Sequence, residues 1–167
     1  MILTRRDSVV ETANYMNLEM RKIQECTIYT KITFSENKSK VLLTTRRRRM
    51  EKKEIEIYVN NKTLQQVNSL NYVGIIFDSK LLFRDHINYI EGKCLKLIFV
   101  LYSSAKITWG LKNKALKIIY TGGILPLLLY GAPVWKGALN RSCYKAKLNR
   151  IQRLINLKIA KVYRTVS

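Results

Sequence analysis

The apolar positions near the start of the chain recur with the period of a helix. They are spaced by three and four residues, and Asp7 or Ser8 can cap the first turn. The pattern predicts an amphipathic helix over residues 8 to 26, with one apolar face that packs on a sheet. The residues of this predicted face are Val9, Val10, Ala13, Met16, Met20 and Ile23.

Short runs of β-branched and aromatic residues follow, and such runs are typical of strands. The runs are Ile28 to Phe34, Val41 to Thr45, Ile55 to Val59, Thr63 to Val67 and Tyr72 to Phe77. Asn60 and Asn61 lie between two of these runs, where this pair favours a tight hairpin turn. We therefore expect a small sheet that packs against the first helix.

After Asp78 the apolar residues again recur about every 3.6 residues, which predicts helices. Asp85, Asn113 and Ser142 can each cap the start of one of these helices. The expected apolar positions are Ile87, Ile90, Cys94, Leu97, Ile98 and Leu101, then Leu116, Ile119 and Tyr120, then Leu148, Ile151, Leu154, Ile155 and Ile159. The whole pattern predicts an α+β fold, in which a small sheet with a packed helix over residues 1–78 is followed by a helical bundle over residues 79–167.

One stretch of the second half, from Ile118 to Trp135, carries no charge and approaches the length of a membrane-spanning helix. Glycines and prolines interrupt it, and they would leave backbone groups unsatisfied in lipid. The interrupting residues are Gly122, Gly123, Pro126, Gly131 and Pro133. We expect a buried helix-turn-helix here rather than a membrane span, and no membrane among the partners.

The composition indicates the class of partner. Of 167 residues, 31 are Lys or Arg and 11 are Asp or Glu, so the formal net charge is +20, while the apolar share of 47% is ample for a packed core. A charge excess of this size repels itself unless a polyanion neutralises it, so nucleic acid is the expected partner. Basic residues occur from Arg5 to Arg164, which favours a broad binding face over a basic tail.

Four consecutive arginines, Arg46, Arg47, Arg48 and Arg49, form the densest positive run. Guanidinium groups contact phosphates well, so phosphate binding is the favoured interpretation. The alternative is a solvated loop that joins two strands. The sequence leaves both open.

The cysteines and histidine place limits on other chemistry. Cys26, Cys94 and Cys143 are far apart, and His86 is the single histidine, so neither a zinc site nor a disulfide framework is expected. The start of the chain has no apolar segment of a secretory signal. We expect a reducing compartment, the nucleus or the cytoplasm. His86 itself is expected to pack near Phe83 at a helix start.

Five local patterns, taken in order, resemble the C-terminal part of reverse transcriptases from LINE-type (non-LTR) retrotransposons. The first is the amphipathic helix that ends near Cys26. The second, Phe34 to Lys40, is similar to the family's Leu-Asn-Pro-x-Lys-Thr block. The third, Asn71 to Asp78, is similar to its Tyr-Leu-Gly-x-x-x-Asp block, with Phe83, His86 and Ile87 following. The fourth, Ile124 to Trp135, is similar to its Leu-Pro-x-Leu-x-Tyr-Gly-x-x-x-Trp block, and the fifth runs from Ile151 to Ser167.

The resemblance covers essentially the whole chain and implies two domains. Residues 1–78 would be the last part of the polymerase palm, a palm-remnant sheet with primer-grip-like strands, and residues 79–167 a thumb-like bundle. The implied partners are RNA and DNA in a template–primer hybrid, and magnesium is the cofactor of the parent family. Glu36 replaces the family's proline, and Met1 to Thr4 resembles the strand after the family's Asp-Asp turn, so we expect the catalytic aspartates to be missing.

The carboxylates of the chain fit that expectation. Polymerases hold two divalent metal ions with carboxylates that converge from separate strands. The aspartates here are Asp7, Asp78 and Asp85, none adjacent to another, and the last two are expected to serve as turn and cap residues. We predict no cofactor bound by this chain alone.

The resemblance also assigns roles to individual residues. The lysine that matches Lys38 lies near the incoming nucleotide in the family, where it could neutralise the leaving pyrophosphate, although a plain surface lysine is the favoured interpretation. Tyr72, Val73 and Gly74 resemble the primer grip, a hairpin that holds the end of the growing strand. The alternative is a core aromatic beside a bulge glycine. Trp109, Tyr130 and Trp135 are expected in the helical core.

Three hypotheses of function remain open from the sequence. The first is a partial reverse transcriptase, an RNA-directed DNA polymerase fragment that binds template–primer nucleic acid but lacks the catalytic aspartates. The second is a non-catalytic host module for nucleic-acid binding or interaction. The third is a gene fragment without function. The oligomeric state is not indicated by the sequence.

Overall fold

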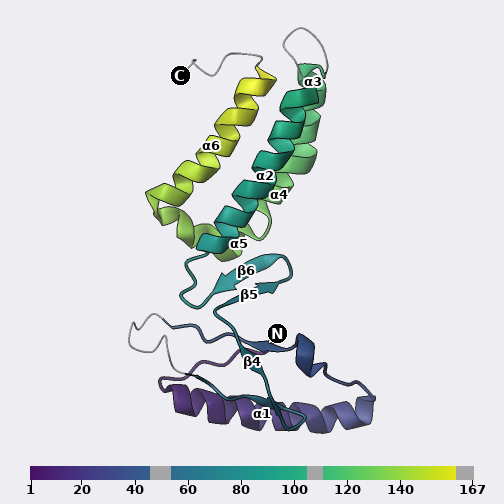
Figure 1. Cartoon of the computed structure of the whole chain (residues 1–167), viewed down its shortest axis with the longest axis vertical. Helices are drawn as coiled ribbons and strands as arrows, with labels where there is room; N and C mark the ends of the chain where they lie inside the picture. The colour runs from purple at the N-terminus through teal and green to yellow at the C-terminus, as the bar shows by residue number, and fades with distance from the viewer. Residues whose placement is uncertain (46–53, 105–110, 161–167) are drawn as a thin grey trace. The chain divides into compact units, whose positions relative to one another are not determined.

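The computed structural model describes residues 1–45, 54–104 and 111–160 (Figure 1). It divides into two compact units, Met1–Leu81 and Leu82–Ser167, which we call the first unit and the helical unit. Short strands and a long helix make up the first unit, and the described residues of the other are mainly helical. This mixture of helices and small strand pairs is compatible with the predicted α+β class.

Helix α1, Val9–Thr30, packs its apolar face on the extended segment that leads into β2, Tyr58–Val59. Side chains of that segment alternate between buried and exposed, as a strand with one covered face requires. The buried core consists of Met20, Ile55, Ile57, Val59 and Leu64, with Val9, Ala13, Met16, Ile23, Val41 and Leu43 packed against it. The predicted helix face is thus confirmed except for Val10, which is exposed.

The strand predicted from Ile28 to Phe34 is wrong, because α1 continues to Thr30. Threonine hydroxyls satisfy preceding carbonyls inside the helix: Thr27 donates to the Gln24 carbonyl oxygen at 2.7 Å. Such back-bonding makes a β-branched residue compatible with a helix. Lys31, at φ 54°, ends the helix in the left-handed region.

The strands of the first unit form pairs rather than one continuous sheet among its described residues. β1, Lys40–Val41, runs parallel to β4, Gln65–Gln66. β2 pairs with β3, Lys62–Thr63, and β5, Ser69–Tyr72, pairs with β6, Ile75–Asp78, both antiparallel. The predicted strand from Val41 to Thr45 is therefore limited to its first residue, and the single sheet becomes three short pairs.

Two tight turns set the register of the antiparallel pairs. Asn60 and Asn61, with φ of 48° and 61°, join β2 to β3, which confirms the predicted hairpin. Val73 and Gly74, with φ of 49° and 78°, join β5 to β6. The run predicted as one strand, Tyr72 to Phe77, is wrong because this turn divides it.

The helical unit contains the three helices expected from the period: α2, Arg84–Ser104, α3, Asn113–Ile119, and α6, Ser142–Ile159. Between α3 and α6 lie the π-helix η3, Tyr120–Ile124, then α4, Leu125–Leu129, α5, Ala132–Trp135, and the 3-10 helix η4, Lys136–Asn140. Helix α2 contacts both α6 and α4, so it is central in this unit (Figure 1).

Helices α2 and α6 run in the same direction. Lys147, near the start of α6, donates to Asn88 and Glu91 near the start of α2, and the Tyr102 hydroxyl near the end of α2 donates to the Leu154 carbonyl at 2.9 Å. Apolar residues fill the space between the helices. The buried residues include Ile87, Ile90, Cys94, Ile98, Leu101, Leu116, Ile124, Leu128, Trp135, Tyr144, Ile151, Leu154 and Ile155.

The uncharged stretch from Ile118 to Trp135 is helical, but the expectation that it is buried holds only in part. Ile124, Leu128 and Trp135 are buried, whereas Ile118 is 62% exposed and Leu129 53%. No single helix among the described residues is long and apolar enough to span a bilayer. One pair bent by 46°, Asn113–Leu129 with Ala132–Asn140, has a sufficient length and composition.

Candidate nucleic-acid interface

The β5–β6 turn presents the residues that resemble a primer grip at the tip of a hairpin. Tyr72 pairs with Ile75 across the ladder, so the two residues between them form the whole turn. Tyr72, Val73 and Gly74 are all exposed, Val73 by 67%. The Tyr72 hydroxyl accepts from the Met1 amino group at 3.5 Å, on the same unit. An exposed hairpin tip contradicts the alternative of a buried strand with a bulge.

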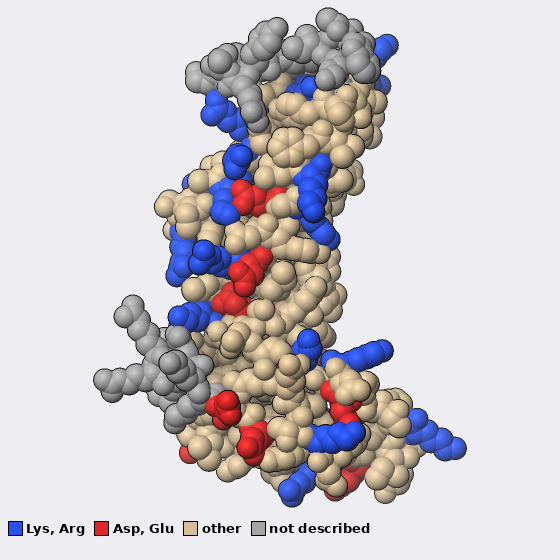
Figure 2. Space-filling model, in the orientation of Figure 1, with Lys and Arg blue, Asp and Glu red and all other residues tan. Residues whose placement is uncertain are grey.

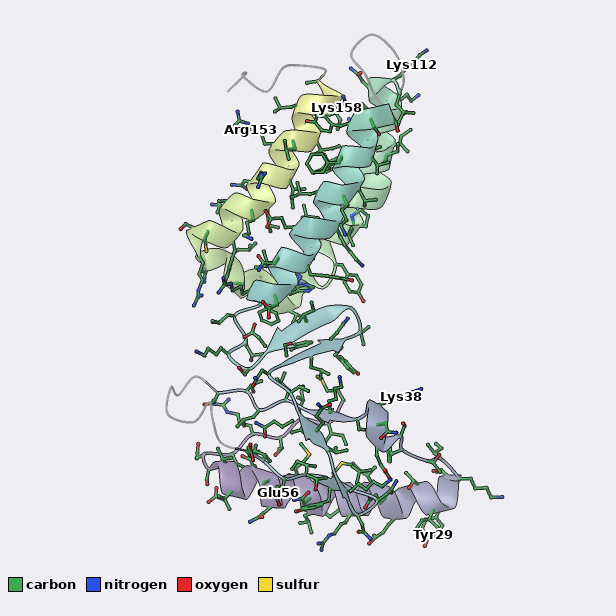
Figure 3. All side chains as sticks on the ribbon, in the orientation of Figure 1. Tyr29, Lys38, Glu56, Lys112, Arg153 and Lys158 are labelled. Carbon is green, nitrogen blue, oxygen red and sulfur yellow. The ribbon has the colours of Figure 1, made fainter. Side chains whose placement is uncertain are left out.

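Lys38 ends a short 3-10 helix, η1, Glu36–Lys38, and its side chain is exposed (Figure 3). Beside it, Lys62 donates to the Glu36 carboxylate at 2.6 Å, and this bond holds the pKa of Glu36 below its usual value. Lys38 and the β5–β6 turn lie on different elements of the first unit.

The arginine run from Arg46 to Arg49 lies outside the described residues. The residue before it, Thr45, donates its backbone N–H to the Ser79 carbonyl at 2.9 Å, just after β6. Thr45 therefore lies close to the end of the β5–β6 hairpin.

The aspartates are distributed as structural residues. The Asp78 side chain accepts the backbone N–H of Lys80 at 3.0 Å, which confirms its expected turn role. Asp85 lies inside the first turn of α2, which begins at Arg84, so its predicted position as the cap is wrong, while Asp7 is exposed before α1. Within the described residues, no group of three or more His, Cys, Asp and Glu side chains could hold a metal ion.

The charge is distributed unequally between the two units, a feature that the sequence analysis missed. The first unit has 15 Lys and Arg against 9 Asp and Glu, whereas the helical unit has 16 against 2. After Glu91 the sequence contains no further Asp or Glu, but it contains 15 more Lys and Arg. Figure 2 shows the consequence: positive side chains dominate the visible face of the helical unit, and both signs mix on the first unit. A count of carboxylates by segment would have shown this contrast.

Helix α6 carries a cationic outer face. Lys145, Arg150 and Arg153 are exposed, and Arg153 lies on the side of the helix away from α2 (Figure 3). Inner cations have other partners. Lys147 pairs with Glu91 at 2.7 Å, and the Lys158 ammonium lies 4.5 Å from the centre of the Tyr102 ring.

Helix α2 adds an aromatic contact on its exposed side. Tyr89 is 39% exposed, and the Lys93 ammonium lies 4.5 Å from the centre of its ring. Lys96 is exposed on the next turn. An exposed aromatic ring among lysines suits stacking on a base together with phosphate contact.

The buried polar side chains of the helical unit have structural surroundings. His86, at the start of α2 as expected, is fully buried, and its ring meets Trp135 edge-on with 6.0 Å between centroids. Burial lowers the pKa of His86 and raises that of the Cys94 thiol to about 11. Trp135 donates its indole N–H to the Tyr130 carbonyl at 2.8 Å. Trp135 is confirmed as core, whereas the Tyr130 side chain is exposed, and Trp109 lies outside the described residues.

The chain is similar in sequence to proteins of one class of mobile element. It is 34% identical over 111 residues to the retrovirus-related Pol polyprotein of the type-1 retrotransposable element R1 of Bradysia coprophila. It is 32% identical over 106 residues to a 115 kDa protein of the element R1DM of Drosophila melanogaster, and 30% over 117 residues to an R1 Pol polyprotein of Nasonia vitripennis. These matches cover 66%, 64% and 69% of the chain.

The relatives are much longer than this chain, because the matched stretch is 11%, 10% and 29% of their respective lengths. No protein-family profile matches the chain, and no solved structure does. The similarity to R1 Pol polyproteins supports an origin in a non-LTR retrotransposon.

Proposed function

We propose that this chain is part of a non-LTR reverse transcriptase that holds template–primer nucleic acid but does not itself carry the catalytic aspartates. Two observations support the proposal. The relatives are Pol polyproteins of retrotransposable elements, and the helical unit carries 16 cationic residues against 2 anionic ones. The second observation carries the binding claim, because it belongs to this chain.

Binding would come chiefly from phosphate contacts. Exposed lysines and arginines on α6 and α2 neutralise phosphates and release condensed counterions, which favours association without regard to base sequence. Lys145, Arg150 and Arg153 would contact the backbone, and Tyr89 would stack on a base or sugar. The partner class is therefore RNA, DNA and their hybrid, in the nucleus or the cytoplasm.

The first unit would contribute orientation. An exposed hairpin tip at Tyr72, Val73 and Gly74 suits contact with the end of a primer strand, since glycine allows a backbone to approach closely. Lys38 would act on a phosphate group nearby, and Arg46 to Arg49 would add phosphate contacts. These roles follow the family resemblance.

Phosphoryl transfer would require carboxylates from elsewhere. Asp78 is engaged by the backbone of its own turn, and Asp7 and Asp85 belong to different units. Magnesium held by a separate pair of carboxylates would neutralise the developing charge on the phosphoryl group. The residues of this chain would position the primer, which by itself leaves that charge unneutralised.

A titration at several salt concentrations tests the binding claim. We expect the purified chain to bind an RNA–DNA hybrid and single strands with similar affinity, and log affinity to fall with log salt by about 0.9 for each phosphate contacted on a duplex. Weak binding that does not change with salt would refute the proposal. Primer extension on an RNA template with magnesium or manganese should give no product, and a product would show that the chain carries its own catalytic centre.

A further inference from the structure

The helical unit exposes an uncharged strip along α3, η3 and α4 that the nucleic-acid surface does not use. The residues of this strip are Ile118, Gly122, Gly123, Pro126, Leu129 and Tyr130, all exposed. Three of its spacings are three or four residues, so these side chains follow one side of the helical rod. Buried residues of the same segment, Ile124 and Leu128, point to the core instead.

Packing within the unit does not require glycine at the two glycine positions in the middle of the strip. A Cβ added at Gly122 or Gly123 would meet no heavy atom within 4 Å. Glycine inside a helix costs roughly 0.5–1 kcal/mol relative to alanine, so a pair of them weakens this segment. The bare backbone does allow another backbone to come close, and the π-helical turn at Tyr120–Ile124 fits a functional site.

The ends of the strip are positive. Lys114 and Lys117 precede it on α3, and Lys136 follows α5; all three are exposed. An occupant should therefore be apolar in its middle, slender enough to lie on the glycines, and acidic or neutral at its ends. An amphipathic helix has this chemistry, because helices pack with ridges of side chains in the grooves of their neighbours.

The sequence relatives indicate where such a helix is encoded. The matched stretch amounts to 11% of the Bradysia R1 polyprotein, so most of that protein lies outside it. An apolar surface of a stretch embedded in a much longer protein is expected to be covered by another part of it. We propose that the uncharged strip docks a helix from the part of an R1-type Pol polyprotein that this chain does not span. This inference is independent of nucleic-acid binding.

Two other occupants make different demands. A bilayer surface would favour large apolar side chains in place of the glycines. A second copy of the chain would bring Lys114, Lys117 and Lys136 of two molecules near one another, and like charges oppose that contact.

The test uses the 167-residue chain and two polypeptides that together cover the part of the Bradysia R1 polyprotein outside the matched stretch. We expect one of the two to bind, as measured by calorimetry and sedimentation velocity. Gly122→Leu should weaken that binding at least tenfold, since the new side chain fills the space that the partner's backbone needs. Gly92→Leu on α2 is the matched control, because its added Cβ also meets nothing within 4 Å.

A second pair of variants checks the apolar contact itself. Ile118→Ser should weaken binding, while Val100→Ser on α2, equally exposed at 63% against 62%, should not. Circular dichroism and hybrid binding should stay unchanged in every variant. The inference fails if neither polypeptide binds or if Gly122→Leu has no effect. Sedimentation with phosphatidylserine vesicles that Gly122→Leu or Ile118→Ser abolishes would overturn the inference in favour of lipid. Self-association that the same variants abolish would overturn it in favour of a second copy.

Discussion

The two units of this chain differ in where recognisable motifs lie and where charge lies. All residues assigned a site role from sequence, Lys38, Arg46 to Arg49 and Tyr72 to Gly74, belong to the first unit. That unit has 9 carboxylates to balance 15 cations. The helical unit supplied no candidate site, yet it has only 2 carboxylates against 16 cations. In the proposed function, the motifs of the first unit would orient a nucleic acid, whereas the cationic excess of the helical unit would hold it.

The cores of the two units differ as well. The first unit buries one face of α1 against an extended segment, and Met20 is the buried residue of that helix. The helical unit buries residues from several helices around α2, including the large side chain of Trp135. Because the cationic excess is larger in the helical unit, the affinity of the chain should depend on the integrity of that core more than on that of the first unit.

The largest effect should come from removing Trp135. Trp135→Ala deletes a side chain that is 1% exposed and loses its bond to the Tyr130 carbonyl, at a cost of about 3–5 kcal/mol to the helical unit. Urea unfolding, monitored by the rate at which the buried thiol of Cys94 becomes labelled, measures this loss of stability. We expect affinity for a hybrid to fall with it.

Ile57→Ala is the counterpart in the first unit, with an expected cost of about 2–5 kcal/mol. It should leave Cys94 protected, because Cys94 belongs to the helical unit. Simultaneous loss of both cores in either variant would show that the chain unfolds as one cooperative body, and the comparison between units would then have no thermodynamic meaning.

The next effect concerns charge. Lys145→Ser, Arg150→Ser and Arg153→Ser together should reduce the slope of log affinity against log salt by about 3, close to one for each lost phosphate contact. The three side chains are exposed, so stability should change little. The matched variant replaces Arg46, Arg47 and Arg48 with serine. It should reduce the slope by less, because this run shares its unit with 9 carboxylates. Equal reductions of slope in the two variants would remove the proposed difference between the units.

A smaller effect should appear with pH. Burial lowers the pKa of His86 below its ordinary value of 6.5, so the folded state keeps the imidazole neutral while the unfolded state takes up a proton below that pH. Stability of the helical unit should therefore be complete above pH 6.5 and decrease as pH falls, by at most about 1.4 kcal/mol per pH unit. Urea midpoints between pH 7.5 and 5.5 measure it. His86→Gln should remove the dependence, and an unchanged slope would assign it to other groups.

The sequence predicted helices with strong periodicity well and short strands poorly. α2 and α6 were predicted because their apolar positions, from Ile87 to Leu101 and from Leu148 to Ile159, recur over several turns and need no distant partner. The run from Ile28 to Phe34 has the composition of a strand. Its first three residues are nevertheless helical, because α1 continues to Thr30 and threonine hydroxyls bond to carbonyls within the helix. Strand pairing depends on partners far along the chain, which local composition does not specify.

The candidate site was predicted in the same uneven way. Tyr72, Val73 and Gly74 lie together at a hairpin tip, and their role in binding stays a prediction. The run around them was predicted as one strand, because β-branched residues conceal a turn at Val73. The exposed face of Ile118 to Tyr130 was expected to be buried, since apolar composition predicts burial without specifying which side is covered.

The smallest effect tests whether the hairpin tip is shaped for binding rather than for stability. Val73 has a φ of 49°, a region that a β-branched residue adopts only with strain of about 1 kcal/mol or more, and its side chain is 67% exposed. Asparagine followed by glycine is the preferred pair for such a turn, so Val73→Asn should stabilise the first unit by about 1 kcal/mol. Urea unfolding, monitored by the fluorescence of a label on Cys26 in this unit, measures the gain in stability.

If the tip contacts a primer, the same substitution removes an exposed apolar group and should weaken binding to a recessed hybrid end more than to an unbroken duplex. Asn61→Gly, at the other hairpin of the unit, is the control: it changes a turn at φ 61° without altering this tip, so it should leave both affinities unchanged. The contrary outcome is a Val73→Asn protein that is more stable but still prefers the recessed end as strongly as the original chain. That result would show that the Val73 side chain makes no contact with the primer, and that binding depends on the helical unit alone.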